Sequence, residues 1–231
     1  MRQHRLKFFL ILLPFFLSVI CHGQDYEVKF RHHTIDSLDE KYSVNSVCQD
    51  SLGFIWVATN NNGLYQFDGY YFKQFSPTSG EDGSFPGDSV YIVYELKNGT
   101  MLAGTNAGLV SFDEKTGLFS FFRKSDVNAG SKDRTILEDR DENVWLGTNS
   151  GLMKYDITSR KANNFNLSKD RTIKEKVNCL TETSNGYIWV GTNNGAYRIN
   201  PDGKTVSFHK TETDNNESQT PNSVVSIFND N

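Results

Sequence analysis

A short sequence motif recurs four times along the chain and constrains the fold more than any other feature. Each copy is an apolar run closed by threonine, then a glycine turn, then a second run that ends near Asp or Asn: IWVATNNNGLYQFD, MLAGTNAGLVSFD, VWLGTNSGLMKYD and IWVGTNNGAYRIN. The closing threonines, Thr59, Thr105, Thr148 and Thr192, are 46, 43 and 44 residues apart. A period in the forties built from short strands is typical of β-propeller blades. The motif therefore predicts a tandem array of blades.

The repeat predicts an all-β fold, a β-propeller of four-stranded antiparallel blades of about 44 residues. Four blades are complete, and the first strand of a fifth follows. The expected blades are 44–75, 89–122, 133–165 and 175–209, and the fifth opens at 224–231. The segments between them are rich in Gly, Pro, Ser, Asp and Asn and read as surface loops. A ring with a partial blade is incomplete, so the sequence predicts an N-terminal fragment of a larger propeller. Uncovered faces and edges of that kind predict poor stability or self-association.

Three positions recur in every repeat, and each has a structural reason to do so. A blade has two apolar faces that it cannot bury alone, so a large apolar residue in the second strand is expected between stacked blades. The threonine closes that strand, and the glycine supplies the turn into the next. The predicted structural positions are Trp56, Thr59 and Gly63; Leu102, Thr105 and Gly108; Trp145, Thr148 and Gly151; and Trp189, Thr192 and Gly195.

The first 23 residues have the pattern of an export signal. Basic residues at Arg2, Arg5 and Lys7 precede an apolar stretch at Phe8–Ile20, which is too short to span a bilayer comfortably. Cleavage is expected after Gly23, and acylation of Cys21 as a lipoprotein is the alternative. Residues 24–43 are expected to be an N-terminal lead-in strand region, and the mature chain is expected to contain no membrane span.

Charge and cysteine content narrow the possible partners and cross-links. Without the signal the chain has 21 basic and 28 acidic residues, a net charge of −7. That balance argues against nucleic acid and against an anionic membrane surface. The remaining cysteines, Cys48 and Cys179, lie in the first and fourth repeats, so two free thiols are favoured over a disulfide.

Candidate catalytic and metal-binding residues are few. Asp139, Asp141 and Asn143 alternate like the start of a calcium loop, but they occupy a hairpin turn and lack the glycine and distal glutamate of such a loop. The adjacent His32 and His33 would point to opposite faces of a strand. We therefore predict no catalytic residue, no cofactor and no metal, and the chain is not expected to be an enzyme. The tyrosines of DGYYF (68–72) form either a sugar-stacking surface or, more simply, an outer edge strand.

The first repeat resembles a known family. The segment VNSVCQDSLGFIWVATNNNGLYQFDGYYFKQF (44–75) is similar to the two-component regulator propeller repeat, roughly V-N-S-I-x-x-D-x-x-G-x-I-W-I-G-T-x-x-G-L-x-R-Y-D-G. The preceding VKFRHHTIDSLDEKYS (28–43) is similar to the lead-in of such sensors. The resemblance extends over essentially the whole mature chain. Leu102 replaces the tryptophan in the second repeat, and Ala196 replaces a leucine in the fourth.

The resemblance implies a location and a role. Such propellers form the periplasmic sensor region of hybrid two-component histidine kinases in Gram-negative, Bacteroidetes-type bacteria, where a phosphorelay follows ligand binding. Many of them sense glycan fragments, so the expected ligand is a small molecule, in particular an oligosaccharide. The kinase itself is not expected in this chain, and no motif marks the ligand-binding residues. A propeller-fold lyase or glycosidase and an envelope protein–protein interaction scaffold are the alternative functions.

Overall fold

The computed structural model describes residues 33–35, 43–77, 84–124, 132–156, 161–168, 175–204, 206–210 and 222–229. The predicted signal peptide (1–23) and nearly all of the predicted lead-in (24–43) lie outside these residues. The chain forms two compact units, 1–35 and 36–231, and the second contains every strand. Within the described ranges, no helix is both long enough and apolar enough to cross a membrane.

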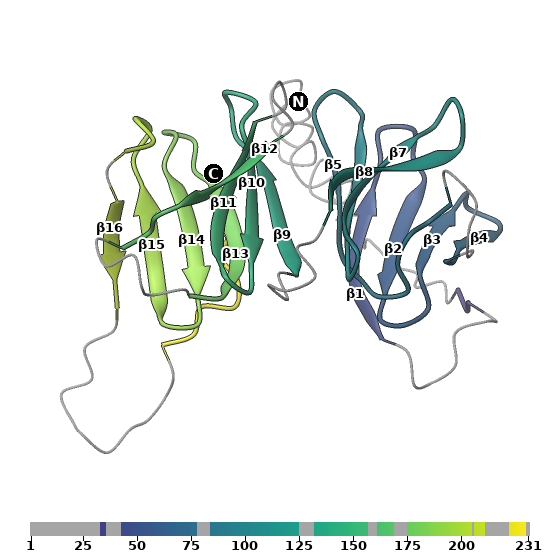
Figure 1. Ribbon diagram of the computed structural model, residues 1–231, viewed down its shortest axis with the longest axis horizontal. Helices are drawn as coiled ribbons and strands as arrows, with labels where there is room; N and C mark the ends of the chain where they lie inside the picture. The colour runs from purple at the N-terminus through teal and green to yellow at the C-terminus, as the bar shows by residue number, and fades with distance from the viewer. Residues whose placement is uncertain are drawn as a thin grey trace, which may run out of the picture. The chain divides into compact units, whose positions relative to one another are not determined.

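The second unit consists of four sheets that follow one another along the chain (Figure 1). Each sheet has four strands in sequence order, and all neighbouring strands are antiparallel. This confirms the predicted all-β fold of four-stranded antiparallel blades. The strands are β1 (Val44–Gln49), β2 (Ile55–Thr59), β3 (Leu64–Phe67) and β4 (Phe72–Phe75); β5 (Val90–Glu95), β6 (Met101–Thr105), β7 (Gly108–Asp113) and β8 (Leu118–Lys124); β9 (Asp133–Glu138), β10 (Val144–Thr148), β11 (Gly151–Asp156) and β12 (Lys161–Phe165); and β13 (Val177–Glu182), β14 (Ile188–Thr192), β15 (Gly195–Ile199) and β16 (Val206–His209).

The threonine that closes each second strand fixes the turn that follows it. Its hydroxyl donates a hydrogen bond of 2.7–2.9 Å to the carbonyl of the turn glycine in all four blades. The four threonines are at most 1% exposed, so this bond satisfies a buried hydroxyl that would otherwise be costly. The glycines all have positive φ, from 75° at Gly63 to 141° at Gly195, a backbone region that favours glycine.

The apolar core lies between successive blades. One buried cluster joins Trp56 of the first blade to Val90 and Val93 of the second. A second joins Leu102 to the third blade, and a third joins Trp145 to the fourth. Each blade therefore buries the second strand of one sheet against the first strand of the next, as stacking of repeats requires.

Residues 222–229 occupy the place where a fifth blade would begin. The Val224 N–H donates to the Thr192 carbonyl at 2.8 Å, and the Asn178 amide donates to the Val224 carbonyl at 3.0 Å. The same amide link joins the first two blades, where Asn45 donates to the Val90 carbonyl at 2.6 Å. The segment thus contacts the fourth blade as β5 contacts the first, although it forms no regular strand ladder.

Candidate functional site

The first strand of every blade contains a β-bulge near its start. The pairing with the second strand skips one residue of β1, β5, β9 and β13, and the skipped residue is always the second of the strand. A bulge removes its residue from the ladder and redirects the side chain, and bulges are common beside binding sites. The four bulge residues are Asn45, Tyr91, Arg134 and Asn178.

All four bulge residues line a single pocket of about 350 Å³. The other lining residues are Lys176, Ser223 and Val225. Val225 follows Val224 as Asn45 follows Val44, so the pocket receives one side chain from the same repeat position of five successive inner segments. Its volume is at the lower end of the range for small-molecule sites. We call it the bulge pocket.

Two of the bulge residues hold neighbouring segments together. The Asn45 and Asn178 amides donate to the first carbonyl of the next inner segment, at Val90 and Val224. Tyr91 and Arg134 occupy the same position in the second and third blades without that bond. Asparagine is thus the residue that the repeat uses for blade contact, whereas Tyr91 and Arg134 give the pocket its own chemistry.

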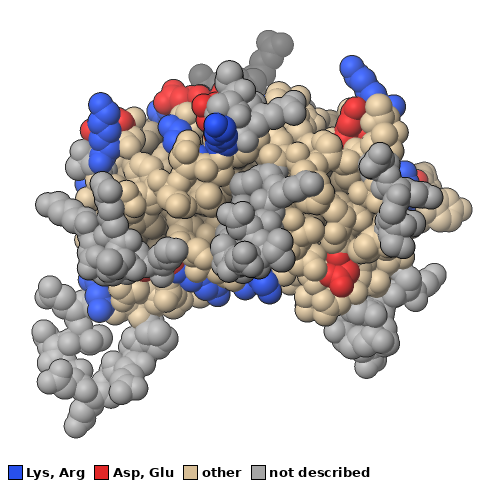
Figure 2. Space-filling model, viewed as in Figure 1, with Lys and Arg blue, Asp and Glu red and all other residues tan. Residues whose placement is uncertain are grey.

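Cationic groups lie in the bulge pocket, at Arg134 and Lys176, and beside its Tyr91, at Lys132. The Arg134 guanidinium lies 6.0 Å from the centroid of the Tyr91 ring, and the Lys132 ammonium lies 4.9 Å from the same centroid. The Arg134 Nε donates to Asn149 Oδ1 at 2.5 Å, which orients the guanidinium. The charged lining residues, Arg134 and Lys176, are both basic. Figure 2 shows Lys and Arg side chains along the lower edge of the view.

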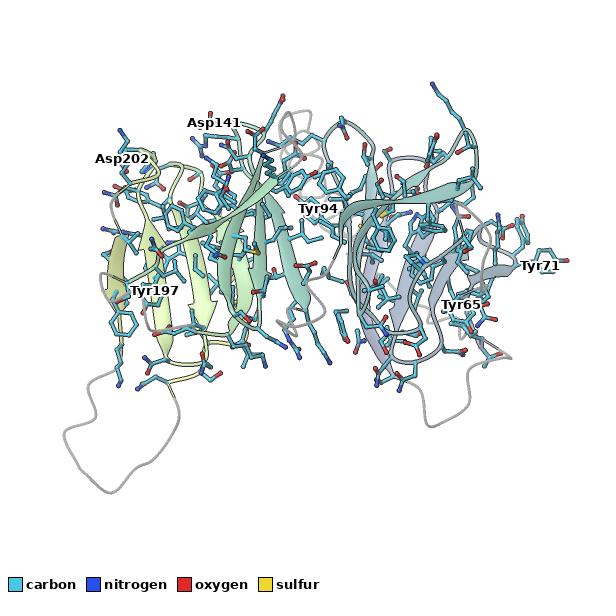
Figure 3. The ribbon with its side chains drawn as sticks, viewed as in Figure 1. Tyr65, Tyr71, Tyr94, Asp141, Tyr197 and Asp202 are labelled. Carbon is cyan, nitrogen blue, oxygen red and sulfur yellow. The ribbon has the colours of Figure 1, made fainter. Side chains whose placement is uncertain are left out.

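A buried carboxylate, Glu175, lies next to Lys176, just before β13. Glu175 is 7% exposed, and its oxygens lie within hydrogen-bond distance of the Tyr197 hydroxyl (2.8 Å), the Asn194 amide (3.1 Å) and the Thr192 hydroxyl (2.7 Å). Burial, followed by the bond to Glu175, raises the pKa of the Tyr197 phenol far above its ordinary value, so Tyr197 is a neutral donor. Tyr197 is labelled in Figure 3 on the sheet of the fourth blade.

A smaller pocket of about 180 Å³ lies between the third and fourth blades. Its lining includes the predicted calcium-like residues Asp139, Asp141 and Asn143, and Figure 3 shows Asp141 and Asp202 at the upper edge of the view. Asp139 accepts the N–H groups of Asp141 (3.0 Å), Asn143 (2.8 Å) and the Trp145 indole (2.8 Å), so its oxygens close a turn. Among the described residues, no three His, Cys, Asp or Glu side chains are grouped to hold a metal ion.

The tyrosines of the DGYYF segment lie in a turn, not in the edge strand that the sequence suggested. β4 begins only at Phe72, and the N–H groups of Tyr70 and Tyr71 both donate to Asp68 Oδ1 at 2.7 Å. Their side chains are 86% and 79% exposed, and Figure 3 shows Tyr71 pointing away from the sheet. They are two adjacent, exposed tyrosines.

The residues predicted from the repeat lie in the core and the turns, and none of them lines the bulge pocket. The predicted Trp56, Leu102 and Trp145 are at most 1% exposed, whereas Trp189 is only partly buried. The bulge residues are not among the positions predicted from the sequence. The sequence does contain a sign of them. The second residue of each repeat is Asn, Tyr, Arg, Asn and Val in turn, whereas the family pattern has Asn at this position.

Comparison with known proteins supports the repeat assignment. The family model described as "Two component regulator propeller" matches residues 37–61 and 173–194. No curated protein matches the chain in sequence. Both matched segments run through the start of a blade, the first into the turn after Thr59 and the second into the turn after Thr192.

Solved structures share the fold. The extracellular domain of a protein described as a hybrid two component system of B. thetaiotaomicron is 19% identical, with a TM-score of 0.51, over 83% of this chain and 36% of that chain. Virginiamycin B lyase from Staphylococcus aureus is 14% identical, with a TM-score of 0.56, over 74% of this chain and 56% of that chain. YCF48 bound to a D1 peptide is 17% identical, with a TM-score of 0.52, over 77% of this chain and 55% of that chain.

The chain thus spans about a third of the first of these structures and a little over half of the other two. At such identities the likeness establishes the propeller fold and not a shared activity. The family match, by contrast, falls on the repeats themselves. The resemblance predicted from the sequence is thus confirmed at two of the predicted repeats, where the chain matches the two component regulator propeller repeat.

Proposed function

We propose that this chain is the ligand-binding part of an exported two-component sensor, with its ligand in the bulge pocket. The observation that carries the proposal is the set of different side chains that one repeat position places in that pocket from five successive inner segments. A repeat conserves what the fold needs, so the position at which it varies inside a pocket is available for recognition. The family match supports the sensor role. The resemblance implies the periplasm as the location and a glycan-derived small molecule as the ligand, and both are part of this proposal.

The geometry also provides a route for the signal. Asn45 and Asn178 line the pocket and at the same time donate to the next inner segment. A ligand that bonds to these amides, or displaces them, changes the contact between adjacent blades. A difference in ligand affinity between two blade arrangements is what shifts their populations. The signal therefore passes through blade packing, and no bond of the ligand is broken.

Isothermal titration of the folded chain with a panel of neutral and acidic oligosaccharides tests this function. We expect one or more sugars to bind, with affinity lost in Tyr91→Ala and retained in Tyr70→Ala. Tyr70 is the matched control because it is an exposed tyrosine in the turn after β3. Binding that depends on Tyr70 instead would move the site to the exposed aromatic pair. No heat with any sugar, together with a stable protein partner in a pull-down, would favour the scaffold function.

A further inference from the structure

We propose that the ligand of the bulge pocket carries an anionic group, which Arg134 and Lys176 bind. This inference rests on the proposed function, because it assigns the chemistry of the ligand in the same pocket. The whole chain has a formal net charge of −4, yet both charged residues that line this pocket are basic. A local positive site in an acidic protein attracts anions at short range and excludes cations.

Arg134 is oriented to receive such a group. Its Nε donates to Asn149 Oδ1, and its guanidinium lies over the Tyr91 ring. Within the described part of the chain, no bond to its two terminal nitrogens is found. A guanidinium fixed through Nε presents those nitrogens as a planar pair, the geometry that matches a carboxylate, sulfate or phosphate.

Among the described residues, Lys176 forms hydrogen bonds through its backbone and none through its ammonium group. Its N–H donates to Asn193 Oδ1 at 3.0 Å, and its carbonyl accepts from the Asn193 N–H at 3.1 Å. The neighbouring Glu175 is buried among Thr192, Asn194 and Tyr197 and does not line the pocket. The backbone bonds thus fix the base of the Lys176 side chain, and the residues that line the pocket with Lys176 and Arg134 include no carboxylate.

The remaining lining groups are neutral and hydrogen-bonding, apart from Val225. Asn45, Asn178, Tyr91 and Ser223 provide amides and hydroxyls around the two cations. A bare inorganic ion would leave these neutral groups bonded to water. A hydroxylated organic anion would instead contact both the cationic and the neutral groups. The chemistry therefore indicates a small polyhydroxylated compound that carries a carboxylate, sulfate or phosphate.

The experiment compares glucose with glucuronate, glucose 6-sulfate and glucose 6-phosphate by calorimetric titration at fixed ionic strength. At least one of the three anions should bind more tightly than glucose, and the order among them identifies the anionic group. Arg134→Gln and Lys176→Gln should each weaken that binding about ten- to a hundredfold, the usual effect of losing a charged hydrogen bond. Lys115→Gln, which changes an exposed turn lysine, should have no effect. Circular dichroism of each variant checks that it is folded.

Several outcomes would overturn the inference. Glucose binding as tightly as the anions, equal loss in Lys115→Gln, or no binding by any of the three anions would each do so. The first of these, like tight binding of a larger neutral oligosaccharide, would leave the proposed sensor function standing. Loss of binding across the whole oligosaccharide panel would instead remove the proposed function.

Discussion

The environment of the three tryptophans shows how a single residue changes a blade. In the first and third blades, the aspartate after the first strand accepts the indole N–H, at 2.7 Å from Asp50 and 2.8 Å from Asp139. The fourth blade has Thr183 at that position, which has no carboxylate to accept the indole N–H of Trp189. Trp189 is only partly buried and packs on the exposed His209 ring at 5.0 Å. Equivalent tryptophans therefore differ in their contribution to stability.

Replacement of these tryptophans should reveal the difference. Trp145→Ala should lower the free energy of unfolding by about 3–5 kcal/mol, because it removes a fully buried side chain. Trp189→Ala should cost about 1–3 kcal/mol, because part of that side chain is already in water. Urea denaturation of both variants measures the two values. An equal loss would contradict the burial difference.

Stability at high pH should depend on Tyr197. Burial and the bond to Glu175 raise the pKa of its phenol, so the folded state retains the proton more strongly than the unfolded chain, in which tyrosine titrates near pH 10. The contribution of Tyr197 is thus constant below about pH 10 and is lost as pH rises above it. Urea denaturation between pH 8 and 11.5 should show a shallower decline for Tyr197→Phe than for the parent chain. Burial also raises the pKa of Tyr94, Cys48 and Cys179, so some decline should remain.

At the scale of elements, a repeated carboxylate joins each blade to the one before it. The glutamate that ends the first strand of a blade accepts a backbone N–H from the preceding hairpin turn. The three bonds are Ser51 to Glu95 at 2.8 Å, Lys97 to Glu138 at 2.5 Å and Arg140 to Glu182 at 2.9 Å. In the last pair the Arg140 side chain adds an ion pair of 2.6 Å. These bonds link each hairpin turn to the first strand of the next blade, the strand that also carries a bulge residue.

The buried member of this set gives the sharpest test. Glu138 is 6% exposed, so Glu138→Ala leaves the Lys97 N–H without its partner near the core and should cost about 1–3 kcal/mol of unfolding free energy. Glu114→Ala, in an exposed turn, should change that free energy by less than about 0.5 kcal/mol. Thermal or urea unfolding compares the two. If both variants lost the same unfolding free energy, the bond from the Lys97 N–H to Glu138 would make no specific contribution to stability.

The attachment of 222–229 to the fourth blade depends on a glycine. A Cβ at Gly191 would lie 2.8 Å from the Val224 Cγ1 and 2.4 Å from the Cys179 Sγ, closer than such atoms approach. Gly191→Ala should therefore displace the segment and increase hydrogen exchange of Val224, whose N–H is bonded to Thr192. Ala58 already occupies the equivalent position in the first blade, so Ala58→Gly is the control and should leave this exchange unchanged. Unaltered exchange in Gly191→Ala would refute the close packing.

The repeat predicts the elements well because it encodes them directly. Thr59 and Gly63 define a turn by side-chain chemistry and backbone freedom, so the β2–β3 hairpin could be placed from sequence. The bulge at Arg134 could not be placed from the sequence, because it arises from the register between β9 and β10, and the apolar pattern of a strand does not show its register. Tyr70 and Tyr71 were assigned to a strand by their composition, but Asp68 holds them in a turn through local hydrogen bonds. The pocket was therefore accessible only from the folded chain.

At the scale of the whole molecule, one face of the first blade is uncovered in the described residues. Val47 is 59% exposed, whereas the equivalent Val93 and Ile136 are 3% and 5% exposed because the preceding blade covers them. On 222–229, Val225 and Phe228 are 75% and 88% exposed. Val225 lines the bulge pocket, whereas the positions of Val47 and Phe228 face a neighbouring blade elsewhere in the repeat. Apolar surfaces of this kind favour association with another molecule.

We therefore predict that the chain self-associates through these two surfaces. Sedimentation velocity from 1 to 100 μM (on the order of accessible protein concentrations) should show a concentration-dependent shift to larger species. Val47→Lys and Phe228→Ser should each reduce that shift, because a charge or hydroxyl at the contact is costly to desolvate. Leu118→Lys is the matched control, since Leu118 is 49% exposed at the start of β8, away from both surfaces, and should not alter the shift. A single monomeric species at every concentration would show that the exposed valine and phenylalanine do not attract a second copy.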